Sequence, residues 1–443
     1  MLRSMYSGIS GLRGFQTKLD VIGNNIANVN TFGYKKGRVT FKDMISQQVQ
    51  GASSPQQNRG GTNPRQVGLG SQLSSIDTIH TPGSAQSTSR PLDLAISGEG
   101  FFIANDGNLS YYTRSGNLYL DHHGNLVNAD GLYIQGYPAD GEGNIDRTAI
   151  SNLRIASGSA IAPNATSEIN FKGNLHAGTK PVDANAEFAL TNGDYSLGQI
   201  RNALDHGIMY DMKVVDSVGF THNLSLVLQK TSETAWTLGY IVPTDDEEVF
   251  TYEELSADIE FDDKGVITEQ SRNNIRNIRL NVTANELTPG YTGAAAPLNI
   301  NLDLTALTQY GSSNSFDVDT MNGNTEGFLE GFDVSQSGEI FGIYTNGNVQ
   351  ALGQIALATF NNPEGLTKAG DNLYQVSNNS GMPNIGIPGD AGGSIIGGSL
   401  EMSNVDLAEE FTEMIVAQRG FQANTRIITT SDEILQELVN LKR

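Results

Sequence analysis

The sequence contains no cysteine, a single tryptophan and far fewer basic than acidic residues, and these shortages exclude whole classes of protein. Without cysteine, neither a disulfide framework nor thiolate ligation of a metal is available. The 27 Lys and Arg against 49 Asp and Glu give a formal net charge of −22, which repels nucleic acid and anionic membrane surfaces. We therefore expect no nucleic-acid partner.

Long apolar segments are also lacking. The sequence has no apolar run long enough to span a bilayer, and its first eight residues lack the apolar core of a cleavable signal peptide. We therefore expect neither membrane insertion nor signal-peptide cleavage. If the protein leaves the cell, it uses another export route.

Patterns that carry catalysis are missing too. The six histidines are scattered, and no His-Glu-x-x-His, phosphate-binding glycine loop or Gly-x-Ser-x-Gly turn occurs. Residues 140–146 alternate acidic side chains with glycine like a calcium loop, but Ile145 stands where such a loop needs glycine. A polar turn is the better interpretation there, and residues 245–248 (Asp-Asp-Glu-Glu) are interpreted as a solvated loop. We expect no enzyme, no cofactor and no metal site.

Proline is absent from both ends of the chain, because all 13 prolines fall between Pro55 and Pro388. Both ends can therefore form long helices, and apolar residues recur there at heptad spacing. The N-terminal set is Met5, Leu12, Leu19 and Ile26 with Leu2 and Ile9 at the alternate position. The C-terminal set is Leu407, Met414, Phe421, Ile428 and Leu435 with Phe411 and Val439. The pattern predicts two terminal helices that pair as a coiled coil.

Polar residues and one glycine interrupt the alternate positions of both stripes: Gln16, Gly23, Gln418, Thr425 and Asp432. A pair of amphipathic helices packed on a globular core therefore remains an alternative. Residues 1–50 hold seven Lys and Arg against two Asp and Glu (+5), and residues 400–443 hold four against eight (−4). The two ends should attract each other and neighbouring copies.

Between the ends, the sequence predicts short strands joined by tight turns. The apolar stretches 101–103, 118–120 and 132–134 alternate with Asn-Asp-Gly, His-Gly-Asn and Ala-Asp-Gly sequences, which tolerate the positive φ of hairpin turns. A more acidic segment, about 152–324, contains the only tryptophan, Trp236, and interrupts this pattern of short strands and turns. It is interpreted as an insertion of one or two β-domains.

The predicted fold is mainly β with α-helical termini, in a nested multidomain order. We expect an N-terminal helical assembly segment (1–50), a flexible connector (51–70), a discontinuous core β-domain (71–151 and 325–399), an inserted β-domain (152–324) and a C-terminal helical assembly segment (400–443). Asn28, Asn30 and Gly33 are residues that stop helices, so the first helix should end near them. Asn404 or Asp406 can cap the second helix.

Four short motifs resemble the bacterial flagellar rod and hook axial protein family. Residues 27–35 (Ala-Asn-Val-Asn-Thr-Phe-Gly-Tyr-Lys) resemble its N-terminal signature, and residues 400–407 with 414–419 resemble its C-terminal signature. Residues 97–102 (Ser-Gly-Glu-Gly-Phe-Phe) and 112–118 (Tyr-Thr-Arg-Ser-Gly-Asn-Leu) are similar to its core β-domain. The motifs occur in the family's order and cover about 1–150 and 325–443.

Within that family, the insertion of about 170 residues favours the hook over shorter rod proteins. The resemblance implies a subunit that self-polymerises into a curved hollow tube, an extracellular universal joint that transmits motor torque, with the insertion as an outer layer. It implies as partners further copies of the chain, the distal rod protein, the hook cap protein, the hook-filament junction protein and the flagellar type III export apparatus.

The expected assembly interface consists of the residues that form the helical stripes and the two terminal signatures. They are Met5, Leu12, Leu19, Ile26, Asn28, Asn30, Gly33, Tyr34, Asn404, Leu407, Phe411, Met414, Phe421, Ile428 and Leu435. Two alternatives stay open: a distal rod or other flagellar axial protein, and a β-rich extracellular binding module such as an adhesin. An adhesin would not need oppositely charged heptad stripes at its two ends.

Overall fold

The computed structural model of the chain describes residues 2–52, 54–55, 59–156, 158, 160–182, 189–244, 249–255, 258–293, 295–390 and 392–440. The predicted acidic loop at 245–248 lies outside these residues. The chain forms two compact units. Unit 1 comprises Met1–Ser157, Gly331–Gly342 and Val349–Arg443, and unit 2 comprises Gly158–Glu330 and Ile343–Asn348. Both ends of the chain therefore belong to unit 1, and its middle forms unit 2.

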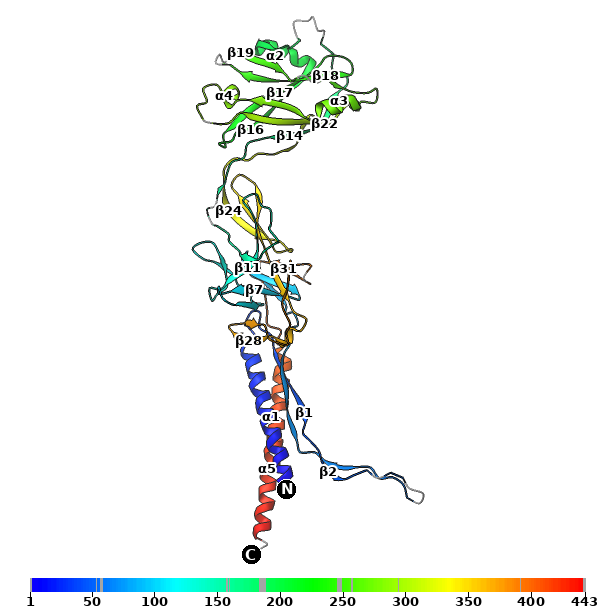
Figure 1. Cartoon of the computed structure of the whole chain (residues 1–443), viewed down its shortest axis with the longest axis vertical. Helices are drawn as coiled ribbons and strands as arrows, with labels where there is room; N and C mark the ends of the chain where they lie inside the picture. Colours follow the sequence, from blue (N-terminus) through cyan, green and yellow to red (C-terminus); the bar gives the residue numbers. More distant parts are fainter. Residues whose placement is uncertain are drawn as a thin grey trace. The chain divides into compact units, whose positions relative to one another are not determined.

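Unit 1 contains the two long helices, α1 (Leu2–Ala27) and α5 (Leu407–Asn440), which lie side by side (Figure 1). The Asn28 side chain donates to the Asn24 carbonyl at 2.9 Å, and Gly33 has a φ of 71°, so the chain turns away directly after α1. Asp406 caps α5 by accepting the Ala408 N–H at 2.8 Å. Of the two candidate caps, the helix therefore uses the aspartate.

A two-stranded ribbon follows α1. Strand β1 (Gly37–Asp43) pairs antiparallel with β4 (Ser71–Thr78), and β2 (Gln47–Gln50) pairs with β3 (Arg65–Val67). Segment 51–70, predicted to be a flexible connector, thus contains one paired strand. The β1–β4 ribbon packs against α1, with the Phe41 ring against Gly14. Because a ribbon has no second layer, many of its apolar side chains remain exposed.

The main sheet of unit 1 brings strands from both halves of the chain together. Its order is β25 (Glu339–Tyr344), β26 (Val349–Ile355), β11 (Tyr133–Pro138), β7 (Phe101–Asn105), β8 (Ser110–Thr113), β29 (Leu373–Gln375) and β28 (Thr367–Gly370). Short strands extend it: β9 (Tyr119–Leu120), β10 (Leu126–Val127), β12 (Ser151–Asn152), β27 (Leu357–Thr359) and β30 (Asn384–Gly386). The strands predicted at 101–103, 118–120 and 132–134 are confirmed as parts of β7, β9 and β11.

Two further pairs join the N-terminal to the C-terminal half of unit 1. Strand β5 (Ala85–Ser87) pairs with β32 (Ser399–Glu401), and β6 (Leu94–Gly98) pairs with β31 (Gly393–Gly397). Both pairs are antiparallel, and β32 leads directly toward α5. They fix where the second helix leaves the sheet.

Many tight turns use one recurring arrangement of an Asp or Asn followed three residues later by glycine. The side-chain oxygen accepts the N–H groups two and four residues on, and the glycine has a φ between 76° and 93°. The turns begin at Asp121, Asn128, Asp140, Asp216 and Asp262. The segment 140–146 is therefore built as a turn, as its sequence predicts.

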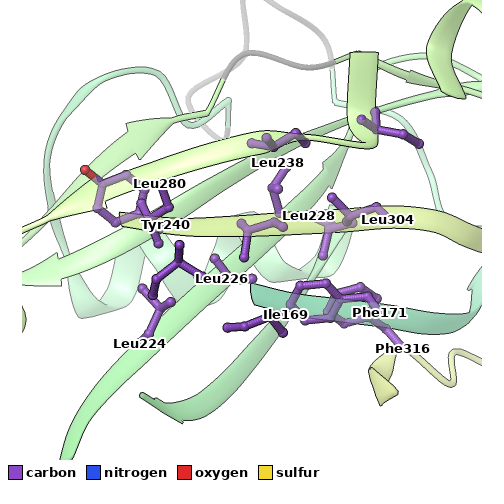
Figure 2. Close-up of a cluster of buried hydrophobic side chains, with 14 of the residues drawn as sticks. Ile169, Phe171, Leu224, Leu226, Leu228, Leu238, Tyr240, Leu280, Leu304 and Phe316 are labelled. Atoms are coloured by element: carbon purple, nitrogen blue, oxygen red, sulfur yellow. The ribbon is translucent and has the colours of Figure 1, made fainter. Parts of the chain in front are cut away.

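Unit 2 is a sandwich of two sheets around one core. One sheet has the order β21 (Ile278–Val282), β22 (Leu298–Tyr310), β14 (Glu168–His176) and β23 (Asp317–Met321). The other has the order β15 (Gly193–Ser196), β19 (Val249–Glu254), β18 (Ala235–Pro243), β17 (Thr221–Lys230) and β16 (Gly207–Val215), with β20 (Ile259–Glu260) beside β18. Figure 2 shows Phe171 and Ile169 of β14 directed toward Leu226 and Leu228 of β17.

Short helices cover parts of unit 2. They are α2 (Leu197–Ala203), α3 (Glu269–Ile275) and α4 (Ala284–Leu287), and each begins at a Ser or Thr whose hydroxyl caps the helix. Ile200 of α2 packs on Val227 and Ile241, on the other face of the larger sheet. Because one hydrophobic core connects both sheets, the inserted segment forms a single compact unit. Strands β13 (Ala160–Ile161) and β24 (Gly327–Val334) pair at its two chain ends.

Candidate assembly site

The two terminal helices pack antiparallel along a seam that contains several small residues. Gly8 lies against Ile428, and Phe15 lies against Gly420, so residue numbers rise along one helix as they fall along the other. A Cβ at Gly420 would come within 2.5 Å of the Phe15 ring. Lys18 and Glu413 form an ion pair of 2.8 Å across the helices. The glycines therefore allow an approach that larger side chains would prevent.

One heptad position of each predicted stripe takes part in this pairing. Met5, Leu12, Leu19 and Ile26 of α1 are partly buried, and so are Met414, Ile428 and Leu435 of α5. By contrast, Leu407, Phe411 and Phe421 are 40%, 49% and 37% exposed. These three side chains remain available for contact with other molecules.

The alternate heptad position differs from the prediction on both helices. The sequence pattern favours Ile9 and Phe411, but both are exposed, and the seam instead buries Gly8, Ile22, Ala417 and Ser431. Val439 is exposed as well, and the side chain of Leu2 lies outside the described residues. The prediction was wrong at these positions because a heptad pattern selects large hydrophobic side chains, whereas close helix approach at Gly8, Ala417 and Ser431 requires small ones. Hydropathy does not register this steric requirement.

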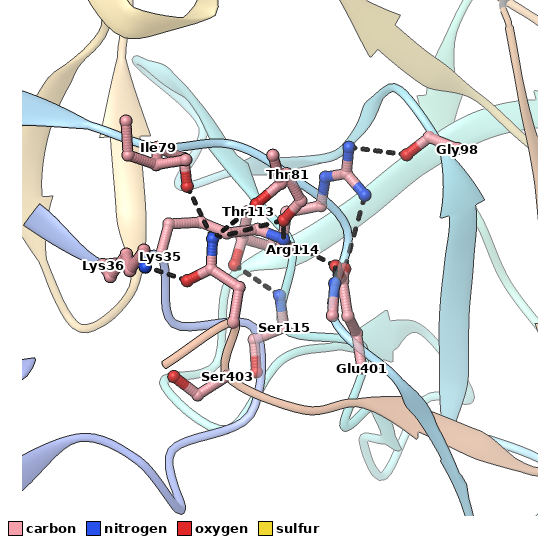
Figure 3. Close-up of polar contacts among 12 residues, drawn as sticks. Lys35, Lys36, Ile79, Thr81, Gly98, Thr113, Arg114, Ser115, Glu401 and Ser403 are labelled. Atoms are coloured by element: carbon pink, nitrogen blue, oxygen red, sulfur yellow. Dashed lines mark hydrogen bonds and ion pairs between the residues drawn. The ribbon is translucent and has the colours of Figure 1, made fainter. Parts of the chain in front are cut away.

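A buried cluster of three charges lies where the two ends of the chain meet. We call Lys35, Arg114 and Glu401 the clasp (Figure 3). Lys35 Nζ lies 2.6 Å from one oxygen of Glu401, and an Arg114 nitrogen lies 3.4 Å from the other. All three side chains are at most 2% exposed. Lys35 also donates to the Thr81 carbonyl at 2.8 Å, and Arg114 to the Gly98 carbonyl at 2.9 Å.

The clasp joins all four sequence motifs. Lys35 ends the first motif, Gly98 belongs to the second, Arg114 to the third and Glu401 to the fourth. The backbone strengthens the connection, because the Gly33 N–H donates to the Glu401 carbonyl at 2.8 Å. Four segments that are far apart in the sequence thus make one hydrogen-bonded site. Their common role is to anchor the terminal segments on the sheet.

Family models for flagellar proteins match this chain at the same segments. "Flagella basal body rod protein" matches residues 5–35, and "Flagellar hook protein FlgE/F/G D1 domain" matches residues 95–175. "Flagellar basal body protein FlaE D2 domain" matches residues 205–324, and "Flagellar basal body rod FlgEFG protein C-terminal" matches residues 396–441.

Similarity to curated proteins extends over the whole chain. The flagellar hook protein FlgE of Borreliella burgdorferi is 41% identical over 461 residues, covering 100% of both chains. The flagellar hook protein FlgE of Treponema pallidum is 38% identical, again with 100% of both chains covered. The chain belongs to the flagellar hook protein family. The flagellar basal-body rod protein FlgG of Bacillus subtilis is 34% identical, and the match also covers 100% of both chains. Chain length alone therefore does not distinguish a hook protein from a rod protein.

The other predicted interface residues of this hook-family chain lie around the clasp. Tyr34 is buried and donates to Asn25 Oδ1 at 3.2 Å, and Asn25 in turn donates to Glu410 of α5 at 3.2 Å. Asn404 accepts the Lys36 N–H and donates to the Ile79 carbonyl, both at 2.8 Å. Asn30 is exposed. Within one subunit, Tyr34 and Asn404 therefore act as anchors of the helices.

Burial dominates the electrostatics of the clasp. Removal from water lowers the pKa of Lys35, and the negative charge of Glu401 opposes this shift. Removal from water also lowers the pKa of Arg114, and Glu401 again opposes it. One carboxylate thus holds two buried cations, which makes Glu401 the residue on which the cluster depends.

His80 lies beside the clasp without any hydrogen bond. Its ring meets Phe101 and Tyr374 edge-on, with centroid distances of 5.5 and 5.3 Å, and both ring nitrogens are buried and unpartnered. Burial, together with the charges of Lys35, Arg114 and Lys368, lowers the pKa of His80 to about 4. The imidazole is therefore neutral in the folded unit at neutral pH.

We expect unit 1 to lose stability as pH falls from the ordinary histidine pKa of about 6.5 to about 4. The unfolded chain binds a proton at His80 throughout this window, and the folded unit does so only at its lower end, so acid favours unfolding. The full loss is roughly 3 kcal/mol. His80→Phe keeps the aromatic packing and removes the titration. Urea midpoints followed by circular dichroism should then vary less with pH than in the wild type; equal variation would contradict the prediction.

Two negative findings concern other kinds of site. Among the residues that the structure describes, no group of three or more His, Asp or Glu is placed to hold a metal ion. In the same part of the chain, no helix is long and apolar enough to cross a membrane.

Proposed function

We propose that this chain is the structural subunit of the bacterial flagellar hook, a non-enzymatic protein that polymerises into a curved hollow tube. The observation that carries the proposal is the full-length similarity to flagellar hook proteins, which includes unit 2 as well as both terminal segments. The proposed tube acts as a universal joint that transmits motor torque to the filament.

The terminal helices are the proposed contact surface between subunits. Their mutual seam uses one side of each helix and leaves Leu407, Phe411 and Phe421 exposed on α5. Exposed apolar side chains along an otherwise ordered helix are typical of surfaces that other molecules cover. Contacts with further copies would bury them, while the clasp holds each helix pair in position on its own sheet.

The proposed partners follow from this role. The subunit adds to the distal rod protein beneath the hook cap protein, and later meets the hook-filament junction protein. It leaves the cell through the flagellar type III export apparatus and functions outside the cell.

Sedimentation and electron microscopy of the purified full-length protein test this proposal. We expect long tubular polymers, because a contact that joins one surface of a subunit to a different surface of the next subunit can repeat without closing into a ring. An adhesin would stay monomeric or form small closed oligomers, and that outcome would refute the hook proposal.

The rod alternative is supported by the full-length match to a protein with a rod name. Immunogold labelling of isolated basal bodies separates the two. Labelling outside the outermost ring of the basal body supports the hook, and labelling confined to the axle within the rings supports the rod.

Excision of unit 2 should change the mechanics of the tube more than its formation. Unit 2 has its own core, so a short Gly/Ser bridge in place of its main segment, residues 158–330, should leave unit 1 folded. We expect export and tube assembly to continue, because the helices and the clasp remain. The tube should become straighter, since contacts of unit 2 with neighbouring copies are lost. Electron microscopy of cells would show this, and complete absence of hooks despite an exported, folded subunit would contradict it.

A further inference from the structure

A groove with a volume of about 560 Å³ lies between α1 and the β1–β4 ribbon. We call it the ribbon groove. Tyr6 and Ile9 line it from α1, and Met44, Leu69 and Leu73 line it from the ribbon segment. Tyr6 is 69% and Leu73 41% exposed. The apolar lining faces away from the helix seam and is not covered within the described part of the subunit.

Two cations accompany this apolar lining. Arg3 and Arg13 both line the ribbon groove and are exposed. The ion pairs found among the described residues involve neither guanidinium. An occupant of this groove should therefore combine apolar side chains with carboxylates.

The C-terminal end of α5 has this chemistry. Gly8 lies against Ile428, so in an antiparallel pair Leu2 falls near residue 434, and α5 continues to Asn440. Ile434 is 46% and Val439 67% exposed. Glu433 and Glu437 are exposed beside them. This helix end, residues 433–440, extends beyond α1 and combines apolar and acidic side chains.

We propose that the end of α5 of one subunit seats in the ribbon groove of another. Apolar Ile434 and Val439 would cover the groove lining, and Glu433 and Glu437 would face Arg3 and Arg13. The groove and the helix end are different surfaces of the same chain, so the contact is heterologous and repeats into an open helical polymer. This inference rests on the proposed hook function and assigns the surfaces that join its subunits.

The absence of cysteine allows a direct test by disulfide cross-linking. The full-length double variant Leu73→Cys with Val439→Cys places one thiol in the ribbon groove and one on the helix end. After polymerisation and mild oxidation, we expect a ladder of covalent oligomers in a denaturing gel, because a disulfide forms only between nearby residues. A bond within one subunit would give no ladder.

The matched control is Leu73→Cys with Ile415→Cys. Ile415 is 58% exposed and lies on the same helix, far from its end. The inference predicts no ladder for this pair. Polymers that give no ladder with Val439→Cys, or an equal ladder with both pairs, would overturn it. If the wild type forms no polymer at all, the proposed hook function fails instead, so the two failures are distinguishable.

Charge reversal gives a second, independent measurement. Arg3→Glu with Arg13→Glu, and separately Glu433→Lys with Glu437→Lys, should each abolish sedimentable polymer, and a mixture of the two proteins should restore it. Lys213→Glu with Lys264→Glu changes the net charge as much as the first pair at exposed positions of unit 2, and should leave polymerisation unchanged. Normal polymerisation of both reversed proteins, or loss without restoration in the mixture, would overturn the inference.

Discussion

Replacing Ala417 by aspartate is expected to abolish polymerisation while both units stay folded. Ala417 is fully buried on α5, in the seam with α1, and a carboxylate there would lose its hydration without gaining a partner. The helices should separate, because their pairing depends on a close approach at small residues. The sheets have hydrophobic cores of their own and should persist. Circular dichroism would report the strands, and sedimentation with electron microscopy would report the polymer.

Ala408→Asp is the matched control for this change. Ala408 is exposed in the first turn of α5, where a negative charge is favourable beside the positive end of the helix dipole. The Ala408→Asp variant should form tubes of normal length and number. Leu12→Asp places a charge on a partly buried residue of the seam and should behave like Ala417→Asp. Phe421→Asp places a charge on an exposed side chain that is proposed to contact other copies, and should also abolish polymerisation. Tubes of normal length and number from Ala417→Asp would refute the role of the seam in assembly.

Replacing Glu401 by alanine is expected to lower the free energy of unfolding of unit 1 by about 3–5 kcal/mol. The change leaves the buried cations of Lys35 and Arg114 without their carboxylate. It also removes the acceptor of the Gly83 N–H. Urea denaturation followed by far-ultraviolet circular dichroism should show an early transition. Trp236 is the only tryptophan and belongs to the core of unit 2. The urea transition followed by its fluorescence should therefore keep the midpoint of the wild type.

Glu409→Ala serves as the control for a neighbouring ion pair. Glu409 binds Lys36, the residue after Lys35, at 2.8 Å, but these side chains are 55% and 21% exposed. Exposed pairs contribute about 0–1 kcal/mol, so the transition should scarcely move. A similar effect of both variants would show that burial does not decide the contribution of the clasp.

Local signals in the sequence were enough to predict the elements of the fold. The absence of proline and the heptad spacing predicted both helices, since these depend on backbone geometry and on one face of each helix. The Asp-Gly and Asn-Gly sequences predicted tight turns, because few residues accept positive φ. The insertion was recognisable by its composition, but whether its strands share one core depends on contacts between distant residues. Only the folded unit shows that they do.

The clasp and the seam had no comparable signal. Glu401 is separated from Lys35 by 366 residues and from Arg114 by 287, and nothing local to any of them indicates burial. Each motif could be recognised separately, but the sequence does not indicate that their charged residues meet. Likewise, nothing in the neighbouring sequence shows that a second helix lies against Gly8 and Ala417.

The sequence by itself therefore determined the helical ends, the strand-and-turn texture, the opposite charges of the termini and the membership of the hook family. The first three follow from periodicity, turn chemistry and composition, which act over a few residues, whereas family membership follows from the four motifs and from similarity over the whole chain. The tertiary structure alone decided which heptad position is buried, that four motifs meet around one buried cluster of charges, and that a groove with two cations opens beside α1. Each of these depends on side chains brought together by folding, where close packing and desolvation, rather than local preference, set the free energy.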